Sequence, residues 1–204
     1  MGFKGTWQFT SAALLECPEL PASVADEIES LFHVVVYVCV SLICSTADRH
    51  QNTFLSEFFD GFSLENGELK GGWRKIGAMC CGNIQVGIEP LTFLRHSMDF
   101  GYDHPLNEVV EKMMPIFKAR YARLRKSRQL CAAQANQTGP VVPLASHLVQ
   151  EAEKLDSHTY FQTVLSDVLG REDWPELQAD FISTQRIPER NSKVDDEYAV
   201  FLTD

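Results

Sequence analysis

The chain has 204 residues, enough for one domain with a tail. Hydrophobic residues make up 45% of it and charged residues 23%, a balance too apolar for a wholly disordered protein. The 18 Lys and Arg residues against 28 Asp and Glu residues give a net charge of -10, which argues against general binding to nucleic acid or to anionic membranes.

The start of the chain, MGFKGTWQFT, holds no apolar leader segment. We therefore expect an intracellular, cytoplasmic protein, with the nucleus as the alternative, and no membrane anchor. The cysteines form no CxxC pair and no His follows at finger spacing, so the sequence predicts no structural metal site. Without a leader segment, their thiols are expected to be reduced. They are Cys17, Cys39, Cys44, Cys80, Cys81 and Cys131.

The first clear element is a helix over residues 24–45. Ser23 and Asp26 match a capping box, and acidic residues follow where the helix dipole favours negative charge. The run from Leu31 to Cys44 is apolar on every side but shorter than the about 20 residues of a membrane span. It is typical of a central helix that other elements surround.

Shorter elements are expected next. Residues 52–62 are typical of an amphipathic helix that Gly61 ends, and residues 65–73 have the composition of a turn. Two further helices are predicted at 74–81 and 89–98.

The second half of the chain is also predicted to be helical. The apolar spacing favours a helix over 105–125 with Pro105 in its first turn, a surface loop over 127–143, and helices within 144–170. Residues 172–181 are expected to pack without regular structure, and residues 182–204 to form an acidic, flexible tail. The predicted fold class is all-α, with little or no sheet.

Catalytic motifs are scarce in this sequence. It contains no GxGxxG, Walker A, GxSxG or HExxH pattern. The six histidines are scattered, and His33, inside the apolar helix, is interpreted as structural rather than as a base or ligand. Asp99-Phe100-Gly101 spells DFG, but it follows the central helix and is interpreted as a coincidence.

A group of basic side chains stands out between residues 112 and 150, a stretch that contains no acidic residue. Two interpretations stay open: cations that complement a helix C-terminus and a solvated loop, or a docking patch for an acidic partner or nucleic acid. The residues of this candidate basic patch are Lys118, Arg120, Arg123, Arg125, Lys126 and Arg128.

Two stretches together resemble a known family. GTWQFTSAALL (5–15) and VADEIESLFHVVVYV (24–38) are similar to the fungal-type protein kinase domain, a branch of the eukaryotic protein kinase fold. FLSEFFDGF, PLNEVVEKMMPIFKARYA and REDWP extend the resemblance to about residue 181. It implies that residues 1–181 form the C-terminal lobe of a kinase-like fold, without the β-rich N-terminal lobe.

The resemblance also implies roles for particular residues. Residues 5–15 would be the end of the activation segment and the loop that receives substrate, and residues 24–45 the central helix. Within the first stretch, the remnant of the substrate loop would be Gly5, Thr6, Trp7, Phe9 and Ser11. Thr6 would contact the catalytic Asp and Lys of an intact kinase.

The sequence lacks the parts of the family pattern that catalysis requires. The Gly-rich loop, the strand Lys, the catalytic-loop Asp and the metal-binding Asp lie upstream of the activation segment in kinases, whereas only four residues precede Gly5. Glu27, near Ser30, occupies the place of the Asp that anchors the catalytic loop, and its extra methylene displaces the carboxylate. Asp26 lies about 100° away around the helix.

These departures predict a C-lobe fragment with no catalytic residues, no metal site and no cofactor, although the family uses ATP and Mg²⁺. We expect a non-catalytic kinase-like protein that binds a protein partner or itself through the apolar central helix, and no nucleic acid or membrane. One alternative is the truncated product of an active Ser/Thr kinase gene. The other is an unrelated all-α binding protein.

Overall fold

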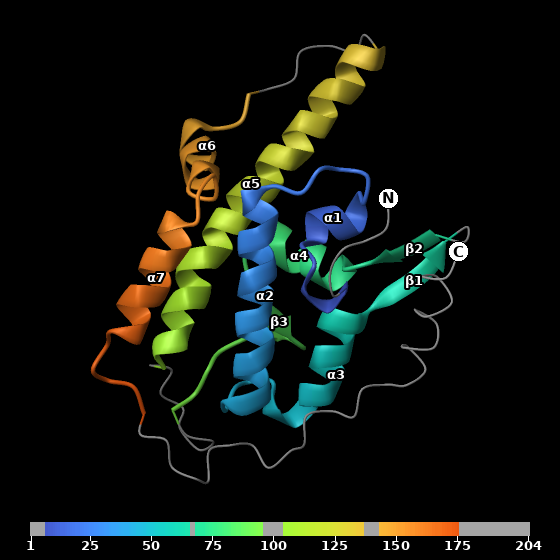
Figure 1. The fold of residues 1–204 in the computed structure, drawn as a ribbon. Coiled ribbons are helices and arrows are strands. Elements are labelled where there is room, and N and C mark those ends of the chain that lie inside the picture. Colours follow the sequence, from blue (N-terminus) through green and yellow to red (C-terminus); the bar gives the residue numbers. More distant parts are fainter. Residues whose placement is uncertain (1–6, 66–67, 96–103, 137–142, 176–204) are drawn as a thin grey trace.

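A computed structural model describes residues 7–65, 68–95, 104–136 and 143–175 (Figure 1). Gly5, Thr6, Asp99, Phe100, Gly101 and the predicted tail at 182–204 lie outside these ranges. The described chain is mostly helical, as predicted. Its elements are η1 (Trp7–Phe9), α1 (Ala12–Glu16), α2 (Val24–Leu42), η2 (Asp48–His50), α3 (Gln51–Leu55), η3 (Ser56–Asp60), β1 (Phe62–Glu65), β2 (Glu68–Gly71), α4 (Trp73–Cys81), β3 (Gln85–Val86), β4 (Glu89–Pro90), α5 (Pro105–Asn136), α6 (Ser146–Glu153) and α7 (Thr159–Leu169).

The helix predicted at 24–45 is confirmed as α2, although it ends at Leu42. Its capping box is present: the Ser23 backbone N–H donates to Asp26 Oδ2 at 2.9 Å. One face of α2 is buried, with Phe32 fully inside the core. The Phe32 ring lies 5.1 Å from that of Phe117 on α5, centroid to centroid. Burying a side chain of this size contributes about 1.5–3 kcal/mol.

The long helix α5 passes behind α2 and has α6 and α7 along one side (Figure 1). It starts at Pro105, as predicted, but it continues to Asn136, so the predicted loop at 127–143 was wrong over residues 127–136. This stretch lacks an apolar rhythm, yet it is rich in Arg, Gln, Leu and Ala, which are the strongest helix formers. Residues 137–142 lie outside the described ranges.

Two small hairpins depart from the expected absence of sheet. Strands β1 and β2 pair antiparallel, with Phe62 opposite Gly71, where only a turn was predicted. Strands β3 and β4 pair around Gly87, whose φ of 64° suits glycine.

The helix predicted at 89–98 was wrong for its described part. The backbone groups of this segment bond to side chains from other parts of the chain and not to one another. Phe93 N–H donates to Asn107 Oδ1 at 2.7 Å, and Asn107 Nδ2 donates to the Phe93 carbonyl at 2.9 Å. Thr92 N–H donates to Thr46 Oγ1 at 3.1 Å. Because these partners satisfy the backbone groups, the segment has no need of helical hydrogen bonds.

The helix predicted at 52–62 is present as α3 followed by the π-helical turn η3, and Gly61 follows its last residue. The helix predicted at 74–81 is confirmed as α4. Gly82 ends α4 with a φ of 77°, a left-handed conformation that glycine adopts without a steric penalty.

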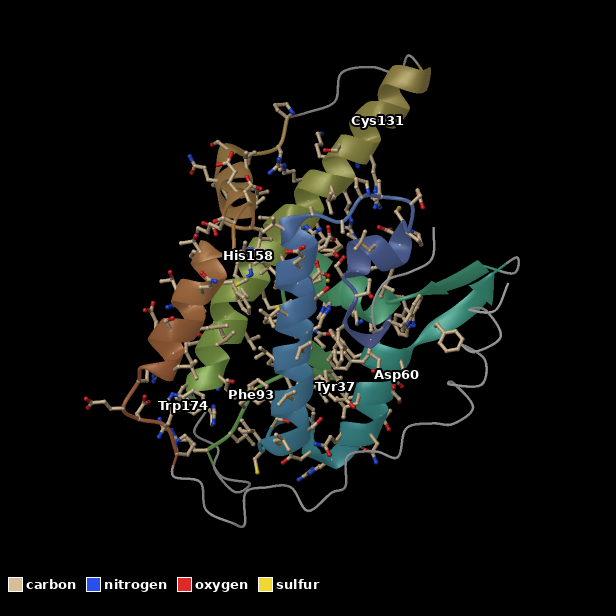
Figure 2. The ribbon with its side chains drawn as sticks, viewed as in Figure 1. Tyr37, Asp60, Phe93, Cys131, His158 and Trp174 are labelled. Atoms are coloured by element: carbon tan, nitrogen blue, oxygen red, sulfur yellow. The ribbon has the colours of Figure 1, made fainter. Side chains whose placement is uncertain are left out.

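Helices α6 and α7 account for the prediction at 144–170. After α7 the chain is irregular, as predicted, up to the last described residue. Trp174 packs there against His104, with ring centroids 5.4 Å apart, and its indole N–H donates to the Val168 carbonyl at 2.8 Å (Figure 2).

No helix within the described residues is both long and apolar enough to cross a membrane. All six cysteines are unpaired. Burial raises the pKa of the Cys39 thiol, on α2, to about 12.

Candidate functional site

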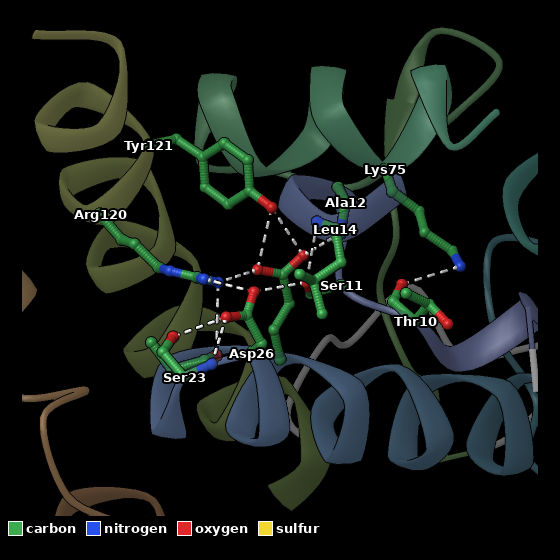
Figure 3. A network of polar contacts seen from close by, with 11 residues as sticks. Thr10, Ser11, Ala12, Leu14, Ser23, Asp26, Lys75, Arg120 and Tyr121 are labelled. Atoms are coloured by element: carbon green, nitrogen blue, oxygen red, sulfur yellow. Dashed lines mark hydrogen bonds and ion pairs between the residues drawn. The ribbon is translucent and has the colours of Figure 1, made fainter. Parts of the chain in front are cut away.

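The most prominent polar feature of the interior is Arg120, which lies between two carboxylates of α2 (Figure 3). Its Nη2 donates to Asp26 Oδ1 and its Nη1 to Glu29 Oε2, both at 2.6 Å. Arg120 is 7% exposed, Asp26 5% and Glu29 0%. The planar guanidinium can serve two carboxylates at once, so this contact fixes α5 against α2.

The same carboxylates hold the start of α1. Ser11 Oγ donates to Asp26 Oδ1 at 2.6 Å and accepts from the Leu14 N–H at 3.3 Å, and the Ala12 N–H donates to Glu29 Oε1 at 2.7 Å. Asp26 and Glu29 therefore bring α1, α2 and α5 together at one point.

Further hydroxyl groups complete the arrangement. The Tyr121 hydroxyl lies 2.9 Å and 3.0 Å from the two carboxylate oxygens of Glu29, and the Ser23 hydroxyl donates to Asp26 Oδ2 at 2.6 Å. We call this set the buried charge network. Its members are Ser11, Ser23, Asp26, Glu29, Arg120 and Tyr121.

The charges of the network are unequal, because one guanidinium faces two carboxylates. For Asp26, burial favours the neutral acid, but Arg120 and the hydroxyls of Ser11 and Ser23 outweigh it and lower the pKa. For Glu29, which has no exposed surface, burial prevails over Arg120 and raises the pKa. Since its members bond one another and all but Ser23 are buried, the network suits a structural role rather than a reactive one.

A second buried cation holds the segment before α1. Lys75 of α4 is 0% exposed, and its ammonium donates to the carbonyls of Gln8 at 2.5 Å and Thr10 at 3.4 Å. It also lies 5.6 Å from the centre of the Phe59 ring. Burial lowers the pKa of Lys75 to about 8, against the opposing effect of the negative charges of Glu29 and Asp60.

His33 lies beside this lysine within a cluster of aromatic rings. It is 0% exposed, and the backbone of Phe9 and Thr10 lies against its ring at a geometry short of a full hydrogen bond to either nitrogen. Phe58 and Phe59 contact the imidazole edge to face at centroid distances of 6.0 Å and 6.3 Å. Burial, followed by the charge of Lys75, keeps the pKa of His33 well below its ordinary value. The ring is therefore neutral and structural at pH 7.

The predicted substrate-loop remnant is partly visible. Trp7 packs edge to face on Phe62 at 6.4 Å, and Phe9 on Tyr37 at 5.4 Å. Ser11 belongs to the buried charge network, whereas Gly5 and Thr6 lie outside the described residues. The described part of this segment is thus held in place by side chains from α2, α4 and β1.

The predicted central-helix anchor, Glu27 near Ser30, is not part of the buried charge network. Glu27 is exposed, and its carboxylate lies 3.2 Å from His158 Nε2 on the outer surface. Ser30 is half-buried. Neighbouring Asp26, on another face of α2, is the buried acid that binds the start of α1. Glu27 and Asp26 are therefore not brought together at one site.

The predicted basic patch requires a correction. Arg120 is not a surface residue: it is buried because Asp26 and Glu29 draw it into the core. Arg128 pairs with Glu16 at 2.5 Å. Lys118, Arg123 and Arg125 are exposed on α5 and Lys126 is half-exposed, so what remains of the patch follows the outer side of that helix.

Helix α2 also carries an apolar surface. Leu31 is 46% exposed, and Val38 and Leu42 are each 44% exposed. Val34 and Val35 are half-buried between them. Their spacing places all five on one side of the helix. We call these residues the α2 stripe.

No group of His, Cys, Asp or Glu side chains in the described ranges could hold a metal ion. Sequence reasoning also missed Lys75, Glu29 and Tyr121 as members of polar sites. Glu29 offered the clearest signal, since it is an acid within one turn of the apolar run of α2, and a buried acid needs a partner.

Comparison with models of known protein families, with curated proteins and with solved structures gives no match.

Proposed function

We propose that this chain is a kinase-like C-lobe portion that binds a polypeptide through the α2 stripe and does not itself transfer phosphate. The observation that carries the binding role is the stripe: five apolar side chains on one helix face. It extends over about 16 Å between Leu31 and Leu42 at 1.5 Å per residue. Contiguous apolar surface on a soluble chain marks contact sites for other molecules.

The kinase-like part of the proposal is supported by the sequence resemblance and by an arrangement compatible with it. The segment that resembles the end of an activation segment packs on the helix that resembles the central helix. The clamp formed by Ser11, Asp26 and Arg120 makes this contact rigid. A rigid scaffold with an apolar helix face suits binding, because little order is lost on association.

The test of the binding role is the oligomeric state of the purified chain. In the absence of another partner, a second copy is the occupant available, so we expect concentration-dependent association by analytical ultracentrifugation across the micromolar range. The double variant Val38→Glu/Leu42→Glu should shift the chain to monomer with an unchanged circular dichroism spectrum. Leu169→Glu is the matched control, since Leu169 is 69% exposed on α7.

A wild-type chain that stays monomeric over this range would refute binding through the stripe. So would equal dissociation by the Leu169 variant. The non-catalytic part is tested separately: Mg-ATP should leave the melting temperature unchanged, and a clear rise would contradict it.

The stripe also suits the alternative of a truncated kinase gene product, in which the rest of a kinase domain would cover α2. The discriminating observation is the genomic sequence upstream of Met1. An in-frame exon that encodes a Gly-rich loop, a strand Lys and a catalytic-loop Asp, present on the transcript, would favour phosphate transfer by the longer product. That product should then phosphorylate Ser or Thr in a protein substrate.

A further inference from the structure

A groove of about 650 Å³ lies on a different surface from the α2 stripe. One wall is the first half of α5, and the other is the segment from Gly82 to Thr92 that contains β3 and β4. This volume lies within the about 300–1,000 Å³ of ligand sites in proteins.

The floor of the groove is apolar and the walls are fixed. Ile84, Leu91 and Met114 are 1%, 5% and 2% exposed, so they form a packed base. The two walls are joined by the pair of hydrogen bonds between Asn107 and the Phe93 backbone. The groove therefore does not depend on a ligand to form.

The rim of the groove is acidic. Glu89 and Glu111 are exposed and face the same groove from opposite walls. No ion pair is found for either carboxylate within the described residues. Two negative charges over an apolar base match a ligand that carries positive charge next to an aliphatic group.

Pro115 leaves one backbone carbonyl of α5 without its helical donor. It lies inside α5 and has no N–H, so the Glu111 carbonyl lacks the donor that residue i+4 ordinarily supplies. Glu111 and Pro115 both line the groove. The carbonyl and carboxylate of Glu111 together suit the several N–H groups of a lysine or arginine side chain.

We propose that this groove binds a short peptide segment of a protein partner in which Arg or Lys alternates with aliphatic residues. The aliphatic side chains contact Pro90, Val110 and Pro115 above the packed base, and the cations lie against Glu89 and Glu111. The net charge of -10 steers such a segment toward the molecule. This inference does not depend on the kinase-like resemblance or on the α2 stripe.

The probe is a hexapeptide of alternating arginine and leucine, titrated into the ¹⁵N-labelled full chain and followed by NMR. We expect shift changes concentrated in 82–92 and 107–115. Glu89→Gln and Glu111→Gln should each weaken binding about two- to fivefold at low salt. The double variant should weaken it further, and added salt should reduce the difference.

Matched controls separate the groove from general charge. Glu153→Gln removes an exposed carboxylate on α6 and should leave the affinity unchanged. Replacing leucine by serine in the probe should weaken binding about fivefold or more, because the apolar contacts are lost. Lys118→Gln removes a cation whose stem packs on Gly82 at the groove edge, so it should not weaken binding.

Three results with the basic probe would overturn the proposal. They are the absence of shift changes at millimolar probe, shift changes centred on α2 rather than on the groove, and equal loss of affinity in the Glu153 variant. An alternating glutamate and leucine hexapeptide that bound as well as the basic one would also refute it.

Discussion

At the scale of single residues, Lys75 is the least expected feature of the molecule. A lysine within a short amphipathic helix is ordinarily solvated, yet this side chain is fully buried and its ammonium contacts backbone carbonyls. Those carbonyls belong to the segment that the sequence interpretation assigned to a substrate loop. The lysine thus fixes Gln8 and Thr10 against α4.

Lys75 should make stability depend on alkaline pH. The pKa is about 8 in the folded chain and 10.5 in the unfolded one, so the unfolded chain binds more protons between these values. The free energy of unfolding should therefore gain, from this group, about 3 kcal/mol as the pH rises from 8 to 10.5. The thiols and Tyr121 act in the opposite direction, so the measured quantity is the difference from Lys75→Met.

Urea denaturation of wild type and Lys75→Met at several pH values between 7.5 and 10.5 measures this difference. The wild type should gain stability relative to the variant as the pH rises. A difference that stays constant over the range would contradict the lowered pKa of the buried Lys75. Lys118→Met, at an exposed position of α5, is the control.

Residue types alone could not predict these roles. Arg120 and Arg128 belong to the same run of basic side chains, yet Arg120 is buried and Arg128 bonds Glu16 at the surface. What differs is the presence of Asp26 and Glu29 opposite Arg120, residues more than 90 positions away in sequence. The nearness of such groups is decided by how α2 packs on α5.

At the scale of elements, the buried charge network joins α1, α2 and α5. Helix α1 has only five residues and would not persist alone. Ser11 and the Ala12 N–H attach it to the carboxylates of α2, and Arg120 attaches those carboxylates to α5. A change at Arg120 should therefore affect all three elements together.

Arg120→Met should lower the free energy of unfolding by about 3–5 kcal/mol, since it leaves Asp26 and Glu29 buried without a cation. Arg120→Lys should also be destabilising, but less, because an ammonium cannot contact both carboxylates in the same planar way. Urea denaturation at pH 7 measures both. Arg123→Met, one turn away and exposed, should be nearly neutral.

If Arg120→Met does not fold, Arg120→Lys retains the test. A loss below about 1 kcal/mol in both variants would mean that the network contributes little, since that is the range of surface ion pairs.

The elements themselves were predicted well where the pattern was strong. The capping box of Ser23 and Asp26, the apolar run of α2 and the rhythm of α5 were read correctly. The hairpin of β1 and β2 was missed, although Asn66-Gly67 between two short alternating runs is a strong hairpin signal. The segment 89–95 gave no such signal, because side chains of Thr46 and Asn107 hold it.

At the scale of the whole molecule, two buried histidines should limit stability in acid. Burial lowers the pKa of His104 to about 4, and His104 Nδ1 accepts the Leu106 N–H at 3.2 Å, a bond that protonation would break. His33 has its pKa lowered in the same direction. The unfolded chain therefore takes up protons from about pH 6.5 downward that the folded chain does not, and stability falls with pH.

His104→Asn keeps a hydrogen-bond acceptor for Leu106, and His33→Leu removes an imidazole whose nitrogens make no full hydrogen bond among the described residues. Each should lose less stability than wild type between pH 7 and 5, as measured by thermal and urea unfolding. Glu29 acts in the opposite direction, because burial raises its pKa, so the comparison with wild type is the informative quantity. His147→Gln, at an exposed position of α6, should match wild type.

The result for the His33 and His104 variants also shows which groups set the acid transition. Equal acid sensitivity in wild type and in the His33→Leu/His104→Asn double variant would place the acid transition on the carboxylates instead. The network around Asp26, whose pKa is lowered in the folded chain, would then be the source.

The sequence by itself determined the mostly helical class, the position of the central helix and the start of α5. Each depends on local signals, namely caps, apolar periodicity and Pro105 in a first turn, that act within a few residues. The tertiary structure alone decided which charges are buried, which face of α2 remains open as the α2 stripe, and where the acidic groove lies. These depend on contacts between residues far apart in sequence, and the free energy of a buried charge is set by the groups that packing brings to it.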